Sequence, residues 1–388
     1  MSVVGATLEN EFAGVGISNA YWKRTVFGKT QYATRRLFLR FPVSPGKTDS
    51  TRAKPIRLSM CIAVERACQA LLNCGDTQIT FFTKRDLLDE NPGPLQVIWD
   101  LESTKQILRK QLSEGFWRYP NAHAKTASPL QDYDQLETYR RLGQLVEKSA
   151  MNRTHPEIQR TAEFLFEKQT DEGDFRGIYG RQYTPNYTSG IMELLIKAGY
   201  ENDPRIERAF KWLLSFRQSD GGWAIPLRTA KHNFRRGSGN PINSLQTVQP
   251  DFSRPSSHMV TGVVLRAFAA HKKYRVSKNV LAAAEMLTSR LFKRDAYTDR
   301  QGPEYWERVS FPFWFTDIVS ALDSLSLVGQ RPIYNFEIEN ALRWLIARQS
   351  EEGVFRLKLL KTGDPLLKYW ESLAICRILK RYYSRSFE

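Results

Sequence analysis

Two carboxylates stand two residues apart where the chain changes from a loop to a helical pattern. Asp132 and Asp134 flank Tyr133, and an apolar periodicity typical of a helix follows them. A carboxyl group that acts as a strong acid has to stay neutral, and burial or a neighbouring like charge raises its pKa. Asp132 supplies such a charge to Asp134. A helix N-terminus instead stabilises the ionised carboxylate, so we expect that Asp134 is not a competent acid.

Three further titratable side chains lie within apolar sequence. Asp317 stands in FPFWFTDIVSAL, Glu371 in KYWESLAI, and His258 near the start of SSHMVTGVVLRAF. Charged side chains are rarely buried unless they are paired. Each of the three is therefore a candidate for lining a ligand-binding cavity. The plainer interpretations are a structural ion pair for the two acids, and a cap or a core side chain for the histidine.

Aromatic and basic residues suggest what such a cavity would bind. Tyr187, Trp314 and Trp370 recur near the starts of the helices that we place inside the fold. They would suit a prenyl chain, or stabilise a carbocation by cation–π contact, and core packing is the competing interpretation. Three arginines in one basic loop could grip a diphosphate or form a solvated surface. These arginines are Arg228, Arg235 and Arg236.

The elements that position these residues form an internal repeat. Apolar helical runs end four times in the same way, with a Gln, an acidic turn, a Gly and an aromatic residue. The four copies begin at Gln111, Gln169, Gln218 and Gln349, and the third reads QSDGGW. Gly accepts the left-handed conformation at low steric cost, which makes it a plausible helix stop. We therefore expect these Gln residues at the ends of outer helices.

The helices alternate at a spacing of roughly 53 residues, which is typical of a repeat protein. A helix pair cannot bury both of its faces alone. The sequence therefore predicts an all-α fold in which five or six helix pairs close into an α/α toroid around a central cavity. Inner helices are expected over 132–148, 184–198, 256–271, 311–327 and 364–382. Outer helices are expected over 155–169, 204–218, 278–293 and 336–349, and earlier helices over 56–73 and 97–111.

Two segments fall outside this regular pattern. Residues 1–54 are not assignable from the sequence, so we expect a single toroid domain over 55–388. The loop over 224–255 is polar, basic and rich in Gly, Pro, Ser and Asn. Loops of this length in compact domains are usually functional or disordered. We expect this loop to cover one mouth of the ring.

The composition sets limits on the class of protein. The chain has 388 residues, a net charge of +16 and 41% hydrophobic residues, which is enough for a large core. The four Cys form no CxxC pair, and no apolar run approaches the roughly 20 residues that span a bilayer. With no secretory signal in the sequence, we expect a cytoplasmic protein, with peripheral membrane contact as the alternative. We find no zinc finger or RNA-recognition signature, so nucleic acid is a minor hypothesis.

The repeated Gln-acidic-Gly-aromatic motif resembles the repeat of terpenoid cyclases and protein prenyltransferase β subunits. The resemblance covers roughly residues 57–388 and implies the α/α-toroid fold. In that superfamily the Gln and the aromatic residue tie an outer helix end to its neighbour. Prenyltransferases hold zinc with an Asp-x-Cys pair and a distant His, and this chain has no Asp-x-Cys. We therefore expect no metal site and no cofactor.

The same resemblance bears on the first carboxylate pair. Squalene and class II diterpene cyclases use a DxDD motif near the start of an inner helix, and its middle Asp protonates the substrate. Asp132 to Gln135 matches the first two Asp of that motif and has Gln135 in place of the last. By resemblance, Asp134 is the candidate proton donor and Asp132 its neighbour, in a motif that lacks one carboxylate.

Two functions therefore stay open from the sequence. The leading hypothesis is a terpenoid cyclase-like or prenyltransferase-like enzyme, without zinc, that binds an isoprenoid or prenyl diphosphate in a central aromatic cavity. The alternative is a non-catalytic toroid that binds a lipid, a peptide or a protein partner. A carbohydrate-active α/α barrel would need two paired carboxylates in the cavity, and the repeat argues against it. The substrate and the oligomeric state do not follow from the sequence.

Overall fold

The structure is a computed structural model, and it divides the chain into two compact units, Met1–Ser59 and Met60–Glu388. It describes residues 6–8, 19–26, 29–36, 50–120, 130–230, 246–297, 301–330, 335–360 and 363–384. The predicted boundary, between residues 54 and 55, lies a few residues before the division between the units. Helix α1 (Ser50–Leu72) runs across this division.

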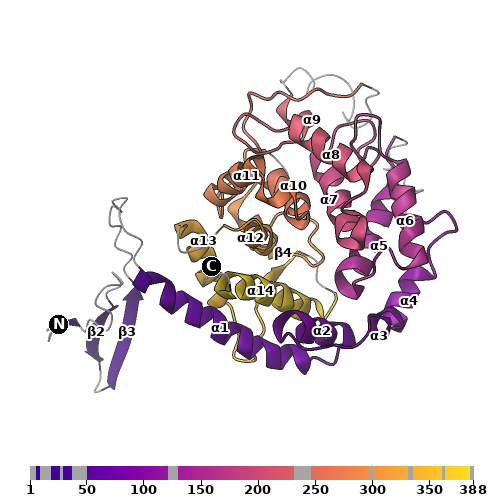
Figure 1. The fold of residues 1–388 in the computed structure, drawn as a ribbon. Coiled ribbons are helices and arrows are strands. Elements are labelled where there is room, and N and C mark those ends of the chain that lie inside the picture. Colours follow the sequence, from indigo (N-terminus) through magenta and orange to yellow (C-terminus); the bar gives the residue numbers. More distant parts are fainter. Residues whose placement is uncertain are drawn as a thin grey trace. The chain divides into compact units, whose positions relative to one another are not determined.

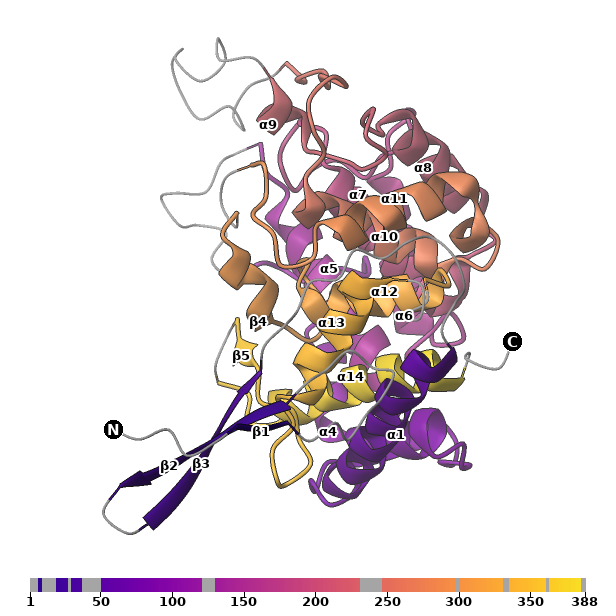
Figure 2. The same ribbon diagram turned by 90° about the vertical axis from the view of Figure 1, so that its left-hand side faces the viewer.

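The first unit contains a small antiparallel sheet. Its strands are β1 (Ala6–Leu8), β2 (Asn19–Val26) and β3 (Lys29–Arg36), in the order β1-β2-β3 (Figure 2). The strands β2 and β3 pair antiparallel, and Tyr21 is opposite Thr34 in their register. These strands lie in the segment that the sequence pattern left unassigned.

The second unit is a ring of paired helices. Successive inner helices pack against one another, and the last of them returns to the first, so the ring closes. The inner helices are α2 (Thr77–Phe82), α5 (Tyr133–Ser149), α7 (Pro185–Leu195), α10 (His258–Ala270), α12 (Ile318–Leu327) and α14 (Leu367–Ser384). The outer helices are α4 (Glu102–Leu108), α6 (Pro156–Glu167), α8 (Pro204–Ser215), α11 (Lys278–Ser289), α13 (Phe336–Ile346) and the second half of α1 (Figure 1). The predicted α/α toroid is confirmed.

Short elements connect the helix pairs. They are the π-helical turns η1 (Thr83–Leu87) and η2 (Ile196–Tyr200), the helices α3 (Gln96–Trp99) and α9 (Pro226–Thr229), and the 3₁₀ turns η5 (Tyr274–Val276) and η6 (Pro303–Glu307). Two short strands, β4 (Arg308–Val309) and β5 (Lys358–Leu359), pair in parallel. No helix among the described residues is long and apolar enough to cross a membrane.

Two predicted helices differ from the structure for local reasons. The helix expected over 311–327 begins only at Ile318, because Asp317 caps it. The Asp317 carboxylate accepts the Ser320 backbone N–H at 2.8 Å, and the Ser320 hydroxyl accepts the Asp317 N–H at 2.9 Å, which is a capping box. The helix expected over 97–111 is broken into α3 and α4, since Leu101 has an extended backbone.

The repeated Gln residues join neighbouring outer helices. Each follows the last turn of an outer helix, as predicted. The Gln169 side-chain nitrogen donates to the Gly173 carbonyl and to the Arg205 carbonyl in the first turn of α8, both at 2.8 Å. The Gln111 nitrogen donates to Gly115 O and to Glu157 O at the start of α6, at 3.1 and 2.9 Å. Each of these Gln side chains therefore joins the turn after its own helix to the first turn of the next outer helix.

The last Gln closes the ring by the same contact. The Gln349 nitrogen donates to Gly353 O at 2.8 Å and to Ala63 O of α1 at 2.7 Å. The third copy differs, because the long loop intervenes before the next outer helix. Gln218 donates instead to the carbonyls of Asp251 and Arg254, at 3.0 and 3.2 Å.

The aromatic residue of each repeat faces inward and is fixed by a hydroxyl group on an inner helix. The Trp223 backbone N–H donates to the Thr261 hydroxyl at 2.9 Å, and its indole N–H donates to Leu213 O at 2.7 Å. The corresponding hydroxyls elsewhere are those of Thr138, Thr188 and Ser372. At the end of each repeat, the Gln therefore bonds a neighbouring segment of the outer layer, and the aromatic residue bonds an inner helix.

The Gly of the repeat packs against the next outer helix, and a matched pair of variants tests this. Gly115 and Gly93 have φ angles of +91° and +90°, so an alanine strains both backbones alike. A Cβ at Gly115 would stand 2.3 Å from Arg160 O, whereas a Cβ at Gly93 meets nothing within 4 Å. We expect Gly93→Ala to lower the free energy of unfolding by about 1 kcal/mol, and Gly115→Ala by about 3 kcal/mol or more. Urea unfolding measures both, and equal losses would contradict the packing.

The Gln contact can be tested in the same way. Gln169→Ala leaves two carbonyls without their shared donor, so we expect a loss of about 1–3 kcal/mol in the free energy of unfolding. Gln106 is the control, since it is exposed and contacts only Glu102 on its own helix. Gln106→Ala should change stability by less than about 0.5 kcal/mol. A Gln169→Ala protein as stable as this control would show that the contact contributes nothing.

Candidate functional site

Asp132 and Asp134 lie at the N-terminal end of α5. The Asp132 carboxylate accepts the Gln135 backbone N–H at 2.8 Å and pairs with the Lys168 ammonium at 2.8 Å. The Asp134 carboxylate accepts the Tyr119 backbone N–H at 2.7 Å. Asp132 therefore caps α5, and Asp134 joins the preceding segment to its first turn. The acid roles considered for the two residues stay predictions.

His258 is a buried residue in the first turn of α10. Its Nδ1 lies 3.4 Å from the Asp295 carboxylate, and its ring stacks on Trp306 at a centroid distance of 4.7 Å. Burial lowers the pKa of His258, and Asp295 only partly opposes this. The same carboxylate accepts the His258 backbone N–H and the Ser257 hydroxyl, so this cluster fixes the beginning of α10.

Asp317 and Glu371 form a buried pair of carboxyl groups on neighbouring inner helices. Each residue is 1% exposed. Neither oxygen of Glu371, nor Oδ2 of Asp317, has a hydrogen-bond partner among the described residues. Burial raises the pKa of Glu371 to about 9, and the charge of Asp317 adds to this. Burial likewise raises the pKa of Asp317 to about 7, against the Ser320 hydrogen bonds and the positive charge of Arg266.

A buried ion pair holds the segment that leads into Asp317. Arg266 of α10 pairs with Glu193 of α7 at 2.8 Å, and donates to the carbonyls of Phe315 and Phe313 at 3.0 and 2.9 Å. Burial alone would raise the pKa of Glu193, but Arg266 and Lys197 hold it below its usual range. The sequence analysis missed both residues. The available signal was a single charge inside each apolar helix, in GVVLRAFAA and IMELL.

The predicted aromatic residues pack against one another in two groups. The Tyr139 ring lies 5.2 Å from that of Trp314 and 6.2 Å from that of Tyr187, edge to face in both cases. Trp370 is buried and stacks on Phe311 at 5.4 Å with an interplanar angle of 6°. These rings fill space among the inner helices, and the aromatic cavity predicted for them stays a prediction.

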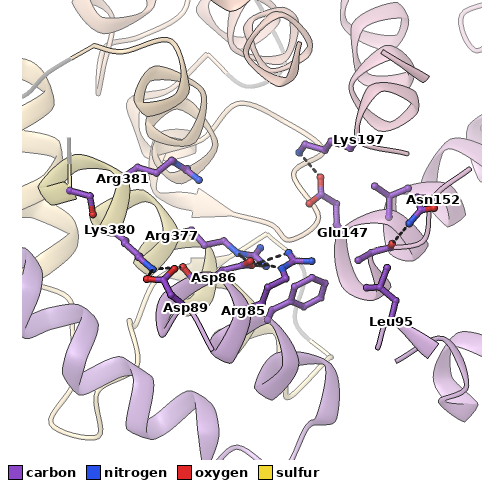
Figure 3. Close-up of a pocket in the computed structure, with 14 residues that line it drawn as sticks. Arg85, Asp86, Asp89, Leu95, Glu147, Asn152, Lys197, Arg377, Lys380 and Arg381 are labelled. Carbon is purple, nitrogen blue, oxygen red and sulfur yellow. Dashed lines mark hydrogen bonds and ion pairs between the residues drawn. The ribbon is translucent and has the colours of Figure 1, made fainter. Parts of the chain in front are cut away.

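A pocket of about 730 Å³ opens among the inner helices near their C-terminal ends (Figure 3). Its apolar lining includes Phe82, Leu95 and Val146. Its basic lining consists of Arg85, Lys197, Arg377, Lys380 and Arg381, and its acidic lining of Asp86, Asp89 and Glu147. Basic side chains therefore outnumber acidic ones around the pocket. Of the predicted site residues that the structure describes, none lines it.

The charged side chains that line the pocket form ion pairs. Asp86 pairs with Arg85 at 2.6 Å and with Arg377 at 2.5 Å, and Arg381 pairs with Asp323. On the opposite side, Lys197 pairs with Glu147 at 2.6 Å (Figure 3). These contacts join η1 to α14, and α5 to η2, so the lining is rigid.

The basic loop contributes little that the structure describes. Arg228 lies in α9 and does not line the pocket. Arg235 and Arg236 lie outside the described residues, so their role as an anion grip stays a prediction. The described end of the loop is anchored, because the Val248 N–H donates to the Gln182 side chain at 3.0 Å.

Comparison with known proteins agrees with this fold. Residues 126–250 match the squalene-hopene cyclase C-terminal domain family. A terpene cyclase-glycosyl transferase fusion protein of Humicola fuscoatra is 29% identical over 121 residues, which is 31% of this chain and 9% of that protein. The chain thus spans only a small part of this relative. The resemblance to the terpenoid cyclase superfamily that the repeats predict is confirmed.

Solved structures of type II terpene cyclases are distant neighbours. A variant of the cyclase MstE from Scytonema is 12% identical, with a TM-score of 0.44, and the match covers 86% of this chain and 99% of that one. A protein from Actinoplanes is 14% identical, with a TM-score of 0.39, over 83% of this chain and 99% of the other. These similarities are too low to transfer a site.

The raised pKa values of the carboxyl pair predict how stability depends on pH. The folded protein holds protons on Glu371 and Asp317 that the unfolded chain releases near pKa 4.5 and 3.8. The free energy of unfolding should therefore fall as the pH rises from about 5, by up to about 1.4 kcal/mol per pH unit for each group. Above pH 7 only Glu371 still contributes, and its effect ends near pH 9.

Urea unfolding of wild type and Glu371→Gln between pH 5 and 8.5 measures this dependence. We expect the slope above pH 7 to flatten in the variant, because an amide does not titrate there. Glu90→Gln is the control, since Glu90 is exposed, and it should keep the wild-type slope. Parallel curves for wild type and Glu371→Gln would mean that Glu371 is already ionised in the folded protein.

Proposed function

We propose that this protein binds an isoprenoid with an anionic head group inside the helical ring and cyclises it. The observation that carries the proposal is the pocket among the inner helices, with apolar side chains beside an excess of basic ones. The family match over residues 126–250 supports the class of reaction. A volume of about 730 Å³ is suitable for a ligand of this size.

The two kinds of lining suit the two ends of such a ligand. Arg85 borders the pocket and can donate a charge-assisted hydrogen bond to a diphosphate. The Lys380 ammonium already donates to Asp89 and to two backbone carbonyls, so it adds positive charge to the lining. Phe82 and Val146 offer an apolar surface to the hydrocarbon chain. A prenyl diphosphate combines both features, and a neutral alkene such as squalene only the second.

Phe82 of the pocket lining belongs to a row of packed aromatic rings. The Phe82 ring lies 5.9 Å from that of Trp370, which in turn stacks on Phe311. Aromatic faces stabilise a carbocation by cation–π attraction. A hydrocarbon chain that extends along these rings would meet the surface that a cyclisation requires.

Calorimetric titration with geranylgeranyl diphosphate, geranylgeraniol and squalene tests binding, and mass spectrometry of extracted products tests turnover. We expect the diphosphate to bind more tightly than the alcohol and to give a cyclic product. Arg85→Gln should weaken its binding about tenfold, which corresponds to one charge-assisted hydrogen bond. Asp86 keeps Arg377 as a partner in this variant.

The control variant is Arg343→Gln. Arg343 pairs with Glu339 on an outer helix, and the Arg85 and Arg343 side chains are both 42% exposed. It should leave the affinity unchanged. No binding of the three ligands by the wild type would refute the proposal. Binding without any product would favour the non-catalytic toroid.

A further inference from the structure

We infer that Glu371 is the proton donor that starts the cyclisation and that Asp317 is its positioning partner. This inference rests on the proposed function, since it assigns the acid of that reaction. It moves the acid from the first turn of α5 to the interface between α12 and α14, which pack side by side (Figures 1 and 2).

Glu371 differs from the other buried acidic residues of the described chain. Most of these are bound to a cation or a hydroxyl group. Glu193 pairs with Arg266, Glu137 with Arg141, and Asp174 with Arg176, at 2.8, 2.7 and 2.8 Å. The Asp295 carboxylate accepts the Ser257 hydroxyl. Glu371 has no such partner for either oxygen.

A buried carboxyl group without a partner is most stable when it is protonated, because burying an unpaired charge is costly. The charged group that acts on Glu371 is Asp317, which opposes ionisation. Arg266, the cation that acts on Asp317, is itself bound to Glu193 and to two backbone carbonyls. The arrangement therefore holds a proton on Glu371 at neutral pH, which is the state that alkene protonation requires.

Glu371 lies on α14, the helix that also carries Arg377 and Lys380 of the pocket lining. It follows Trp370 in the chain, and it precedes Arg377 of the pocket by six residues, or about 9 Å along the helix axis. An isoprenoid with its head group at the pocket therefore reaches the level of Glu371 with its hydrocarbon chain, beside the stacked rings of Trp370 and Phe311.

The proton-transfer step balances without a co-reactant. The alkene π electrons form a new C–H bond with the Glu371 proton, the carboxyl O–H bond breaks, and a tertiary carbocation and a carboxylate result. Ring closure moves the cation along the chain, and loss of a proton to water ends the reaction. The Glu371 carboxylate recovers a proton from solvent, so substrate and product are isomers. Asp317 favours this recovery, since its charge opposes the ionised state of Glu371.

Three substitutions test the inference with geranylgeranyl diphosphate as the probe. Glu371→Gln should reduce turnover at least 100-fold while the dissociation constant changes less than twofold. Glu371→Asp retains an acid and should keep measurable turnover. Asp317→Asn should keep turnover but shift the alkaline limb of its pH profile to lower pH, because the like charge is gone. Glu90→Gln is the control, and circular dichroism checks each fold.

An infrared spectrum gives a second measurement that does not depend on turnover. The wild type should show the carbonyl stretch of a protonated carboxylic acid at pH 7.5, and Glu371→Gln should lack it. Turnover that survives in Glu371→Gln, or that disappears in Asp134→Asn instead, would overturn the inference and leave the proposed function intact. A wild type that binds no isoprenoid, or forms no product, refutes the proposed function and the acid together.

Discussion

The ring depends on a hydrogen-bonded contact in which a Gln side chain joins one outer helix to the next, as Gln111, Gln169 and Gln349 do. A single amide nitrogen donates its two hydrogen bonds to carbonyls of two different segments, as at Gln169 and Gln349. Backbone groups at helix ends otherwise lack partners. Because the contact lies on the outside, it fixes the angle between helix pairs without taking space from the interior.

This external support allows an unusual interior. Inner helices of a toroid need only fill the centre, and here they carry both a buried ion network and an unpaired acid. Glu193 and Arg266 are stable because each satisfies the other. Burial raises the pKa of Glu371, and neither of its carboxyl oxygens has a partner among the residues that the structure describes. Such local costs are found mainly at functional sites, and they require a scaffold that is stable without them.

The repeat fold could be predicted from the sequence because a short local motif marks the end of each outer helix. A Gln, a Gly and an aromatic residue at fixed spacing predict the end of each outer helix, whatever lies beside it. The side-chain contacts between inner helices could not be predicted in the same way. Arg266 and Glu193 are separated by 73 residues and lie on different inner helices, so periodicity shows that each faces inward but not that they meet. Asp317 and Glu371 were likewise predicted as separate candidates and not as a pair.

The residues that line the pocket come from several elements, and no short sequence pattern connects them. These elements include α2, η1, α5, η2 and α14. Gln218 bonds Asp251 and Arg254 instead of an outer helix, and these two residues belong to the long loop itself.

The contact between Gln349 and Ala63 has a consequence for how the ring assembles. It joins residues 286 positions apart in the chain, so the second half of α1 has no outer neighbour on that side until the last repeat has formed. Closing so long a loop is slow, and the entropy is lost before the contact stabilises anything. The intermediate repeats can fold in order as nearest neighbours. The contact between Gln349 and Ala63 then closes the ring, which is complete only when the two ends of the arc of repeats meet.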